Sequence, residues 1–92
     1  MYWDIVKACV SEPWCIDIEF RDGLRGRLRF DRSFFDGVFE PLKSSSLFGQ
    51  VFVESGALAW PGGIDLAPDA LHRLLKASNE CVLSGSGAGI SA

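Results

Sequence analysis

The sequence has little histidine, few cysteines and no long apolar run. Among its 92 residues are one histidine, His72, and three cysteines, so a zinc site would need an unusual ligand set. An odd number of cysteines without paired metal-ligand spacing is typical of free thiols in a reducing cytoplasm. No apolar stretch is long enough to cross a bilayer, and the start at Met1 lacks the features of a signal peptide. We therefore expect a cytoplasmic protein without a metal or other cofactor.

The chain also lacks an excess of positive charge. Nine lysines and arginines stand against twelve acidic residues, for a formal net charge of -3. This balance provides no global attraction to phosphate backbones or to a membrane surface. What the chain does have is apolar material, 48% hydrophobic residues and 12% aromatic residues. Such a composition predicts a globular domain with an aromatic-rich core.

Two alternating runs predict a β-hairpin near the N-terminus. Residues 14–20 and residues 24–30 each place apolar side chains on one face. A three-residue loop brings these faces together and pairs Phe20 with Leu24, whereas a two-residue loop would mix apolar and charged side chains. Gly23 then stands at the left-handed position of this loop class. Phase and turn chemistry thus favour the same register.

The opposite face of this hairpin carries charges of both signs. Arg25, Arg27 and Arg29 form a basic stripe on the second strand. The predicted register places Glu19 beside Arg25, and it places Asp17 beside Arg27. Opposite charges across a ladder contribute roughly 0.2–1 kcal/mol per pair. An ion-paired, solvated face is the favoured interpretation, and the phosphate-binding surface of a nucleic-acid-binding regulator is the alternative.

Three further strands are expected, which makes about five. Residues 5–10 are apolar and β-branched enough to form one of them. The other two form a second hairpin, in which the phase favours a two-residue turn. That turn pairs Val53 with Leu58 and Val51 with Trp60.

The segment 31–50 is predicted to be an irregular connection. Its large apolar side chains do not alternate, and a proline and three consecutive serines interrupt them. We expect one short helical turn near residues 33–36 and another after a cap at Ser45 or Ser46. So many large side chains suggest a cover over the open face of the sheet, with an apolar patch left exposed.

A C-terminal helix is expected to begin at Pro68, where the missing N–H costs nothing. Leucines at positions 71, 74 and 75 form its apolar stripe, and His72 is expected mostly outside that stripe. The prediction is an α+β fold of antiparallel hairpins, an irregular connection and this helix. One domain is expected over residues 1–79, followed by a flexible tail over residues 80–92, most of which is rich in glycine and serine.

The segment 60–69, Trp-Pro-Gly-Gly-Ile-Asp-Leu-Ala-Pro-Asp, is the most specific motif of the chain. It follows Phe-Arg-Asp-Gly at residues 20–23, Val-Phe-Glu-Pro-Leu at 38–42 and Leu-Phe at 47–48. With this ordered set the chain resembles the small bacterial domains catalogued as domain of unknown function 2442. The resemblance implies an α+β fold with antiparallel strands and a C-terminal helix, and no established activity. Some relatives are encoded beside a second small uncharacterised family, which implies toxin–antitoxin-like pairs.

Trp60 and Asp65 are the candidate binding residues of this segment. Trp60 could stack on a ligand, but its position on the apolar face of a hairpin favours a core role. Asp65 follows a glycine-rich turn, so it either accepts hydrogen bonds from nearby backbone N–H groups or contacts a ligand. No catalytic constellation is apparent. The leading hypothesis is a small non-enzymatic interaction module that binds another small protein or itself.

Overall fold

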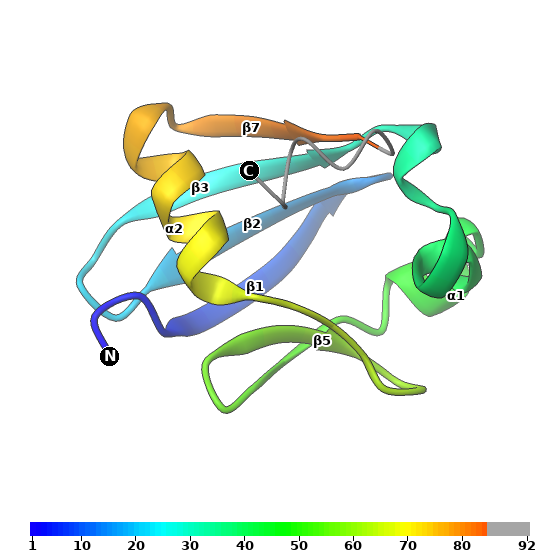
Figure 1. The fold of residues 1–92 in the computed structure, drawn as a ribbon, viewed down its shortest axis with the longest axis horizontal. Helices are drawn as coiled ribbons and strands as arrows, with labels where there is room; N and C mark the ends of the chain where they lie inside the picture. Colours follow the sequence, from blue (N-terminus) through cyan, green and yellow to red (C-terminus); the bar gives the residue numbers. More distant parts are fainter. Residues whose placement is uncertain (85–92) are drawn as a thin grey trace.

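Two β-sheets and a ten-residue helix dominate the described part of the chain, residues 1–84 (Figure 1). In this computed structural model the larger sheet has the strand order β1-β2-β3-β7 and the smaller sheet the order β4-β5-β6. The strands of the larger sheet are β1 (Ile5–Glu12), β2 (Cys15–Phe20), β3 (Arg25–Phe30) and β7 (Glu80–Leu83). Those of the smaller sheet are β4 (Phe52–Glu54), β5 (Ala57–Trp60) and β6 (Ile64–Leu66). The α+β prediction is confirmed, with seven strands in this part of the chain where about five were expected.

The first hairpin has the predicted register. Asp17 lies opposite Arg27, and Glu19 lies opposite Arg25. The N–H of Phe20 donates to the carbonyl of Leu24 at 2.8 Å, which closes the three-residue loop. Gly23 has φ +93°, in the left-handed region that the loop requires. The apolar alternation alone was sufficient to select this pairing.

The second hairpin is also confirmed where its residues are paired. Val53 lies opposite Leu58 across a two-residue turn. Both turn residues, Ser55 and Gly56, have positive φ (51° and 82°), as a type I′ turn demands. Val51 lies just before β4 and takes no part in the ladder of that strand.

The helical segments follow the predicted order. Helix α2 (Pro68–Ala77) begins at Pro68 as expected. The connection between β3 and β4 holds the other three, which are η1 (Arg32–Phe34), η2 (Gly37–Lys43) and α1 (Ser45–Phe48). The serine that caps α1 is Ser44, one residue before those expected, and it accepts a hydrogen bond from the N–H of Leu47. No helix within residues 1–84 is long and apolar enough to cross a membrane.

The connection covers the core without leaving the expected apolar patch. Four of its large side chains are almost inaccessible to solvent: Phe34, Phe35, Leu42 and Phe48. Phe39 and Leu47 are partly buried, and Val38 exposes 73% of its surface. The expectation of an exposed patch is therefore wrong, because the aromatic rings pack on one another and on the end of the sheet, where burial stabilises them most.

Strand β7 corrects the predicted tail. Residues 80–83 form a strand that pairs in parallel with β3, with Leu83 opposite Phe30 and completely buried. The tail was expected from residue 80 because a four-residue run before a glycine-rich segment gives a weak signal. Its pairing partner lies some fifty residues earlier in the chain. The expected flexibility of residues 85–92 lies outside the described residues.

His72 is the other correction. The leucine spacing placed it outside the apolar stripe of α2, yet it is 5% exposed. Its ring packs edge-on against Phe20, with centroids 4.7 Å apart, and against Tyr2. Both the hairpin and the N-terminal segment therefore cover the side of the helix that carries His72.

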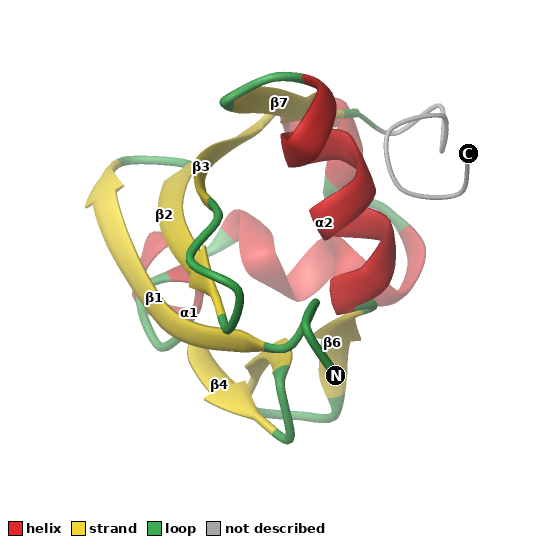
Figure 2. Ribbon diagram, turned by 90° about the vertical axis from the view of Figure 1, so that its left-hand side faces the viewer, coloured by secondary structure: helices red, strands yellow, loops and turns green. Residues whose placement is uncertain are grey.

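Helix α2 lies across one face of the larger sheet and leaves the other face open (Figure 2). Gly26 of β3 makes the close approach possible, because a Cβ built there would lie 2.7 Å from Cδ2 of Leu75. Trp60, Phe20 and Leu28 are among the largest fully buried side chains. The core thus fills the space between the covered face, α2 and the smaller sheet, and the outer face is free for the site described next.

Candidate functional site

The outer face of the larger sheet carries most of the charged candidates. Side chains alternate along a strand, so the burial of Ile16, Ile18 and Leu28 turns the residues between them outward. A shallow hollow of about 560 Å³ lies on this face, lined among others by Lys7, Asp17 and Arg27. The hollow crosses three strands, β1 to β3.

Ion pairs connect the arginine stripe to the neighbouring strands. The Nε atom of Arg27 lies 2.8 Å from Oδ1 of Asp17, and Nε of Arg25 lies 3.4 Å from Oε1 of Glu19. The hydrogen bond from Arg27 holds the pKa of Asp17 below its usual range, and Asp17 in turn raises the pKa of Arg27. Both pairs are those that the predicted register implied.

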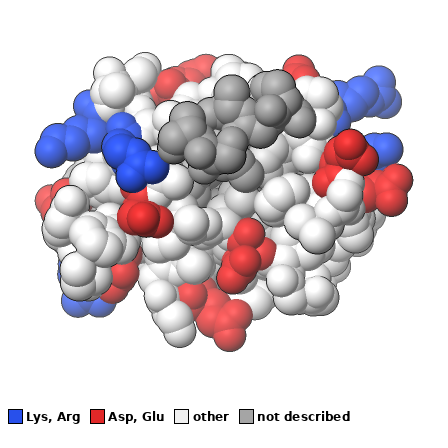
Figure 3. All heavy atoms as spheres, viewed as in Figure 1, with Lys and Arg blue, Asp and Glu red and all other residues white. Residues whose placement is uncertain are grey.

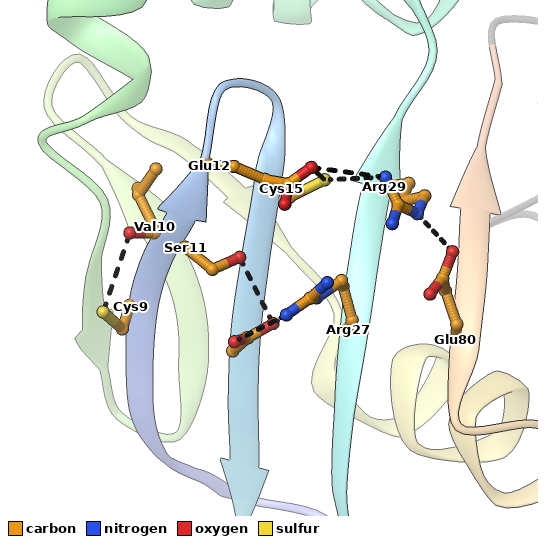
Figure 4. A network of polar contacts seen from close by, with 9 residues as sticks. Cys9, Val10, Ser11, Glu12, Cys15, Arg27, Arg29 and Glu80 are labelled. Atoms are coloured by element: carbon orange, nitrogen blue, oxygen red, sulfur yellow. Dashed lines mark hydrogen bonds and ion pairs between the residues drawn. The ribbon is translucent and has the colours of Figure 1, made fainter.

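Arg29 is held between two acidic residues from opposite sides (Figure 4). It contacts Glu12 of β1, with Nη1 and Oε1 3.6 Å apart, and Glu80 of β7. Its Nη1 also lies 3.4 Å from Sγ of Cys15. Burial raises the pKa of the Cys15 thiol, with Arg29 acting in the opposite direction. All three arginines of the stripe therefore have carboxylate partners, as the register predicted for Arg25 and Arg27.

The other two candidates, Trp60 and Asp65, lie in the smaller sheet. Trp60 is 1% exposed, and its Nε1–H donates to the carbonyl of Phe48 at 3.0 Å. It is a core residue, as its face of the hairpin predicted. Asp65 lies in β6 opposite Ala59, with its side chain exposed. Over residues 1–84 no hydrogen bond to its carboxylate is recorded, so the expected contacts with backbone N–H groups are not formed.

Strand β1 lies at the edge of the larger sheet, and its pairing shows which backbone groups are used. Phe20 donates its N–H to β3, whereas the N–H of Arg21 donates to the carbonyl of Asp4, on the β1 side, at 2.7 Å. Backbone groups alternate between the two sides of a strand. Asp17 and Glu19 therefore direct their backbone N–H and C=O groups towards β1.

The remaining backbone groups of β1 point away from the sheet. Lys7 pairs with Glu19 and Cys9 with Asp17, so Lys7 and Cys9 direct their N–H and C=O groups towards β2. Ala8 and Val10 alternate with these two residues, so they direct their N–H and C=O groups outward, away from β2. In the described part of the chain no backbone hydrogen bond to these outward groups is recorded. The Cys9 thiol lies 3.7 Å from the Val10 carbonyl, to which it donates.

Two irregularities and a turn delimit this open edge. The register of β1 shifts between Ile5 and Lys7 and again between Val10 and Glu12. Beyond the first shift, the N–H of Ile5 donates to the carbonyl of Gly56 at 2.8 Å, so the β4–β5 turn covers that end. Residues 7–10 are the regular open stretch, for which the described part of the chain records no backbone hydrogen bond on the side away from β2, although β4 and β5 pack beside part of β1. Sequence reasoning missed this site because the shifts hide the register of β1, although the terminal position of the strand was a signal.

Lys7 supplies the positive charge of the open stretch. It lies opposite Glu19, which already contacts Arg25. Within residues 1–84 neither an ion pair nor a hydrogen bond is recorded for the Lys7 ammonium group. Val6, next to it, exposes 45% of its surface. The edge thus offers two backbone donors, two backbone acceptors, an apolar side chain and a positive charge.

Metal chemistry finds no support in the described residues. No group of three or more histidine, cysteine, aspartate or glutamate side chains lies close enough there to hold a metal ion. The three cysteines are free thiols. The open stretch of β1 can contribute hydrogen bonds, a positive charge and apolar contact to an interaction.

Comparison with known proteins gives one match. The family described as a protein of unknown function (DUF2442) matches residues 5–77. No curated protein and no solved structure matches the chain. The match covers every element from β1 to the end of α2.

Proposed function

We propose a function from the geometry, because the chain belongs to the family described as a protein of unknown function (DUF2442) and that description assigns no activity. The protein is a non-enzymatic interaction module that receives a β-strand of a small partner protein along β1. The observation that carries this proposal is the row of outward backbone groups of Ala8 and Val10. An edge strand with unpaired N–H and C=O groups is a template for another strand. Strand addition is a common mode of recognition between proteins.

The side chains of the edge indicate what the partner strand carries. Lys7 has no acidic partner in residues 1–84, so a carboxylate on the added strand supplies one. Val6 adds exposed apolar surface beside it. The shifts at both ends of the open stretch confine a partner to a single window, which favours one register. An extended, partly acidic strand with apolar residues is the occupant.

A toxin–antitoxin-like arrangement, implied by the family resemblance, makes the product of the adjacent gene the first partner to test. Self-association through the same edge is the other outcome of that test. The three free thiols are consistent with a reducing cytoplasm as the place where the complex forms.

The experiment combines co-expression with variants that block the edge. The protein is co-expressed with the adjacent gene product, and the mass of the species is measured by size-exclusion chromatography with light scattering. Val10→Pro removes an outward N–H. An edge strand tolerates this change because that N–H takes no part in the hydrogen bonds between β1 and β2. Val82→Pro is the matched control, because the N–H of Val82 also points outward, at the opposite edge of the same sheet.

Loss of the complex in Val10→Pro and retention in Val82→Pro supports strand addition at β1. A complex that survives both Val10→Pro and Ala8→Pro contradicts it. A strictly monomeric protein that retains no partner contradicts the interaction function altogether. Thermal unfolding of each variant confirms that the fold is intact.

The alternative, a nucleic-acid-binding regulator, has less support. Arg25, Arg27 and Arg29 already contact carboxylates, so binding phosphate would require those ion pairs to break. Figure 3 shows the opposite, α2-covered side of the molecule, where acidic side chains also lie among the basic ones. Binding of this kind would weaken steeply with salt and would be lost in Arg25→Gln with Arg27→Gln. Binding to duplex DNA that shows neither property removes this alternative.

A further inference from the structure

A second hollow lies at the end of the larger sheet that holds the β1–β2 turn. It has a volume of about 340 Å³ and is lined by Trp14, Phe30, Arg32, Phe35 and Lys43. These residues come from the β1–β2 turn, the end of β3 and the helical connection. Pockets for small molecules begin at about this size and combine apolar walls with a few polar groups.

Three aromatic rings line this hollow: Trp14 is partly exposed, whereas Phe30 and Phe35 are almost completely buried beneath it. The rings of Phe30 and Phe35 are stacked, with an interplanar angle of 9° and centroids 6.1 Å apart. The ring of Trp14 packs against that of Phe35 at an interplanar angle of 53°, with centroids 5.1 Å apart. A planar ring placed against the partly exposed Trp14 gains both buried area and favourable ring contacts.

The backbone of Trp14 is strained at the same place. Trp14 follows Pro13 in the two-residue turn between β1 and β2, and it has φ +65°. A two-residue turn with proline at its first position and a positive φ at its second normally has glycine at that second position, because a side chain is disfavoured in the left-handed region. The ring is held by contacts with Phe35 and Phe48. Strain that packing maintains is a feature of binding sites.

Two cations complete the lining. Within residues 1–84 no ion pair or hydrogen bond is recorded for the guanidinium group of Arg32, in contrast with the arginine stripe. Among residues 1–84 the contact recorded for the Lys43 ammonium group is an exposed one with Glu40, at 3.8 Å, which is weak in water. In a chain of net charge -3, this hollow is therefore a local positive site without an acidic lining residue.

We propose that this hollow binds a small aromatic anion, a carboxylate or a sulfonate on a planar ring. The ring lies against Trp14, above the buried rings of Phe30 and Phe35. The anionic group lies between Arg32 and Lys43, where the planar guanidinium pairs with two oxygens at once. The site does not depend on strand addition at β1, so either proposal can fail without the other.

Two fluorescent probes with the same type of aromatic body test the site. 1-Anilinonaphthalene-8-sulfonate carries the anion, and N-phenyl-1-naphthylamine lacks it. Each is titrated into the wild-type protein and into Arg32→Gln, with Arg25→Gln as the control for an arginine that already has a carboxylate partner. Amide and indole N–H signals are followed by NMR, so that the bound probe is located.

The sulfonate probe is expected to bind at one site, to shift the Trp14 indole signal and to leave that of Trp60 unchanged. Its Kd is expected to rise about tenfold in Arg32→Gln, while the Kd of the neutral probe stays within about twofold and Arg25→Gln matches the wild type. Equal affinity of the sulfonate probe for Arg32→Gln and the wild type overturns the proposal. An equal loss in Arg25→Gln, or signal shifts elsewhere on the surface, does so as well.

Discussion

The Nε2 atom of His72 lies 2.8 Å from Oδ2 of Asp22, across fifty residues of sequence. This contact ties helix α2 to the loop of the first hairpin. The same carboxylate accepts a hydrogen bond from the N–H of Leu24 at 3.0 Å. The backbone hydrogen bond and, after it, the His72 contact hold the pKa of Asp22 below its usual range. One aspartate thus shapes the hairpin loop and anchors the helix.

Replacement of His72 separates its packing from its polar contact. His72→Ala removes a ring that is 5% exposed and packs against Phe20, and we expect a loss of about 2 kcal/mol in the free energy of unfolding. His72→Phe retains a ring and gives up only the contact with Asp22, so its loss is expected to be smaller. Denaturant unfolding measures both. Equal losses in the two variants would mean that the ring packing contributes nothing.

Gly26→Ala tests the close approach of α2 to the sheet. The added Cβ would lie 2.7 Å from Cδ2 of Leu75 and 3.0 Å from the carbonyl oxygen of Asn79. Overpacking of this kind costs about 1–3 kcal/mol. Leu75→Ala removes the nearest methyl groups, so the double variant should lose less than the sum of the single losses. Strict additivity would show that Leu75 does not oppose the methyl group.

Trp60→Phe tests the core role of that residue. The change removes the indole N–H that donates to the Phe48 carbonyl. It also leaves a cavity, because the Trp60 side chain is 1% exposed and phenylalanine is smaller. We expect a loss of about 2–3 kcal/mol in the free energy of unfolding. Trp14→Phe is the comparison, because Trp14 is only partly buried. A Trp60→Phe protein as stable as Trp14→Phe would refute the assignment.

Acid is expected to destabilise the protein through its aspartates. The hydrogen bond from Arg27 lowers the pKa of Asp17, and Ser33 lowers that of Asp31. Because these groups bind protons less readily when folded, their stabilisation is fully present above the unfolded pKa of about 3.9 and is lost as the pH falls through the lower folded values. Urea unfolding from pH 7 to pH 2 measures this. In Asp17→Asn the loss at low pH should be smaller, and an unchanged profile would contradict the contribution of Asp17.

Local patterns predicted the parts of the fold that are close in sequence. The alternation around Gly23 determines the first hairpin and its ion pairs, because both strands and the loop lie within residues 15–30. Likewise Pro68 marks the start of α2 at the right residue. These features need no knowledge of the distant chain.

Distant pairings account for what sequence reasoning missed. Strand β7 pairs with β3 through a long parallel connection, so nothing near residue 80 reveals its partner. His72 is buried by Tyr2 and Phe20, which no helical periodicity can show. The open edge depends on whether Ala8 or Cys9 directs its backbone N–H and C=O groups away from β2. The register shifts of β1 hide this choice from sequence reasoning.

Amide hydrogen exchange along β1 tests the open edge most directly. In the free protein the N–H groups of Ala8 and Val10 are expected to exchange rapidly, while those of Lys7 and Cys9, which bond to β2, exchange slowly. Adding the adjacent gene product should slow Ala8 and Val10 at least about tenfold, with Val82 unchanged. A bound complex in which Ala8 and Val10 still exchange as in the free protein would contradict strand addition at β1.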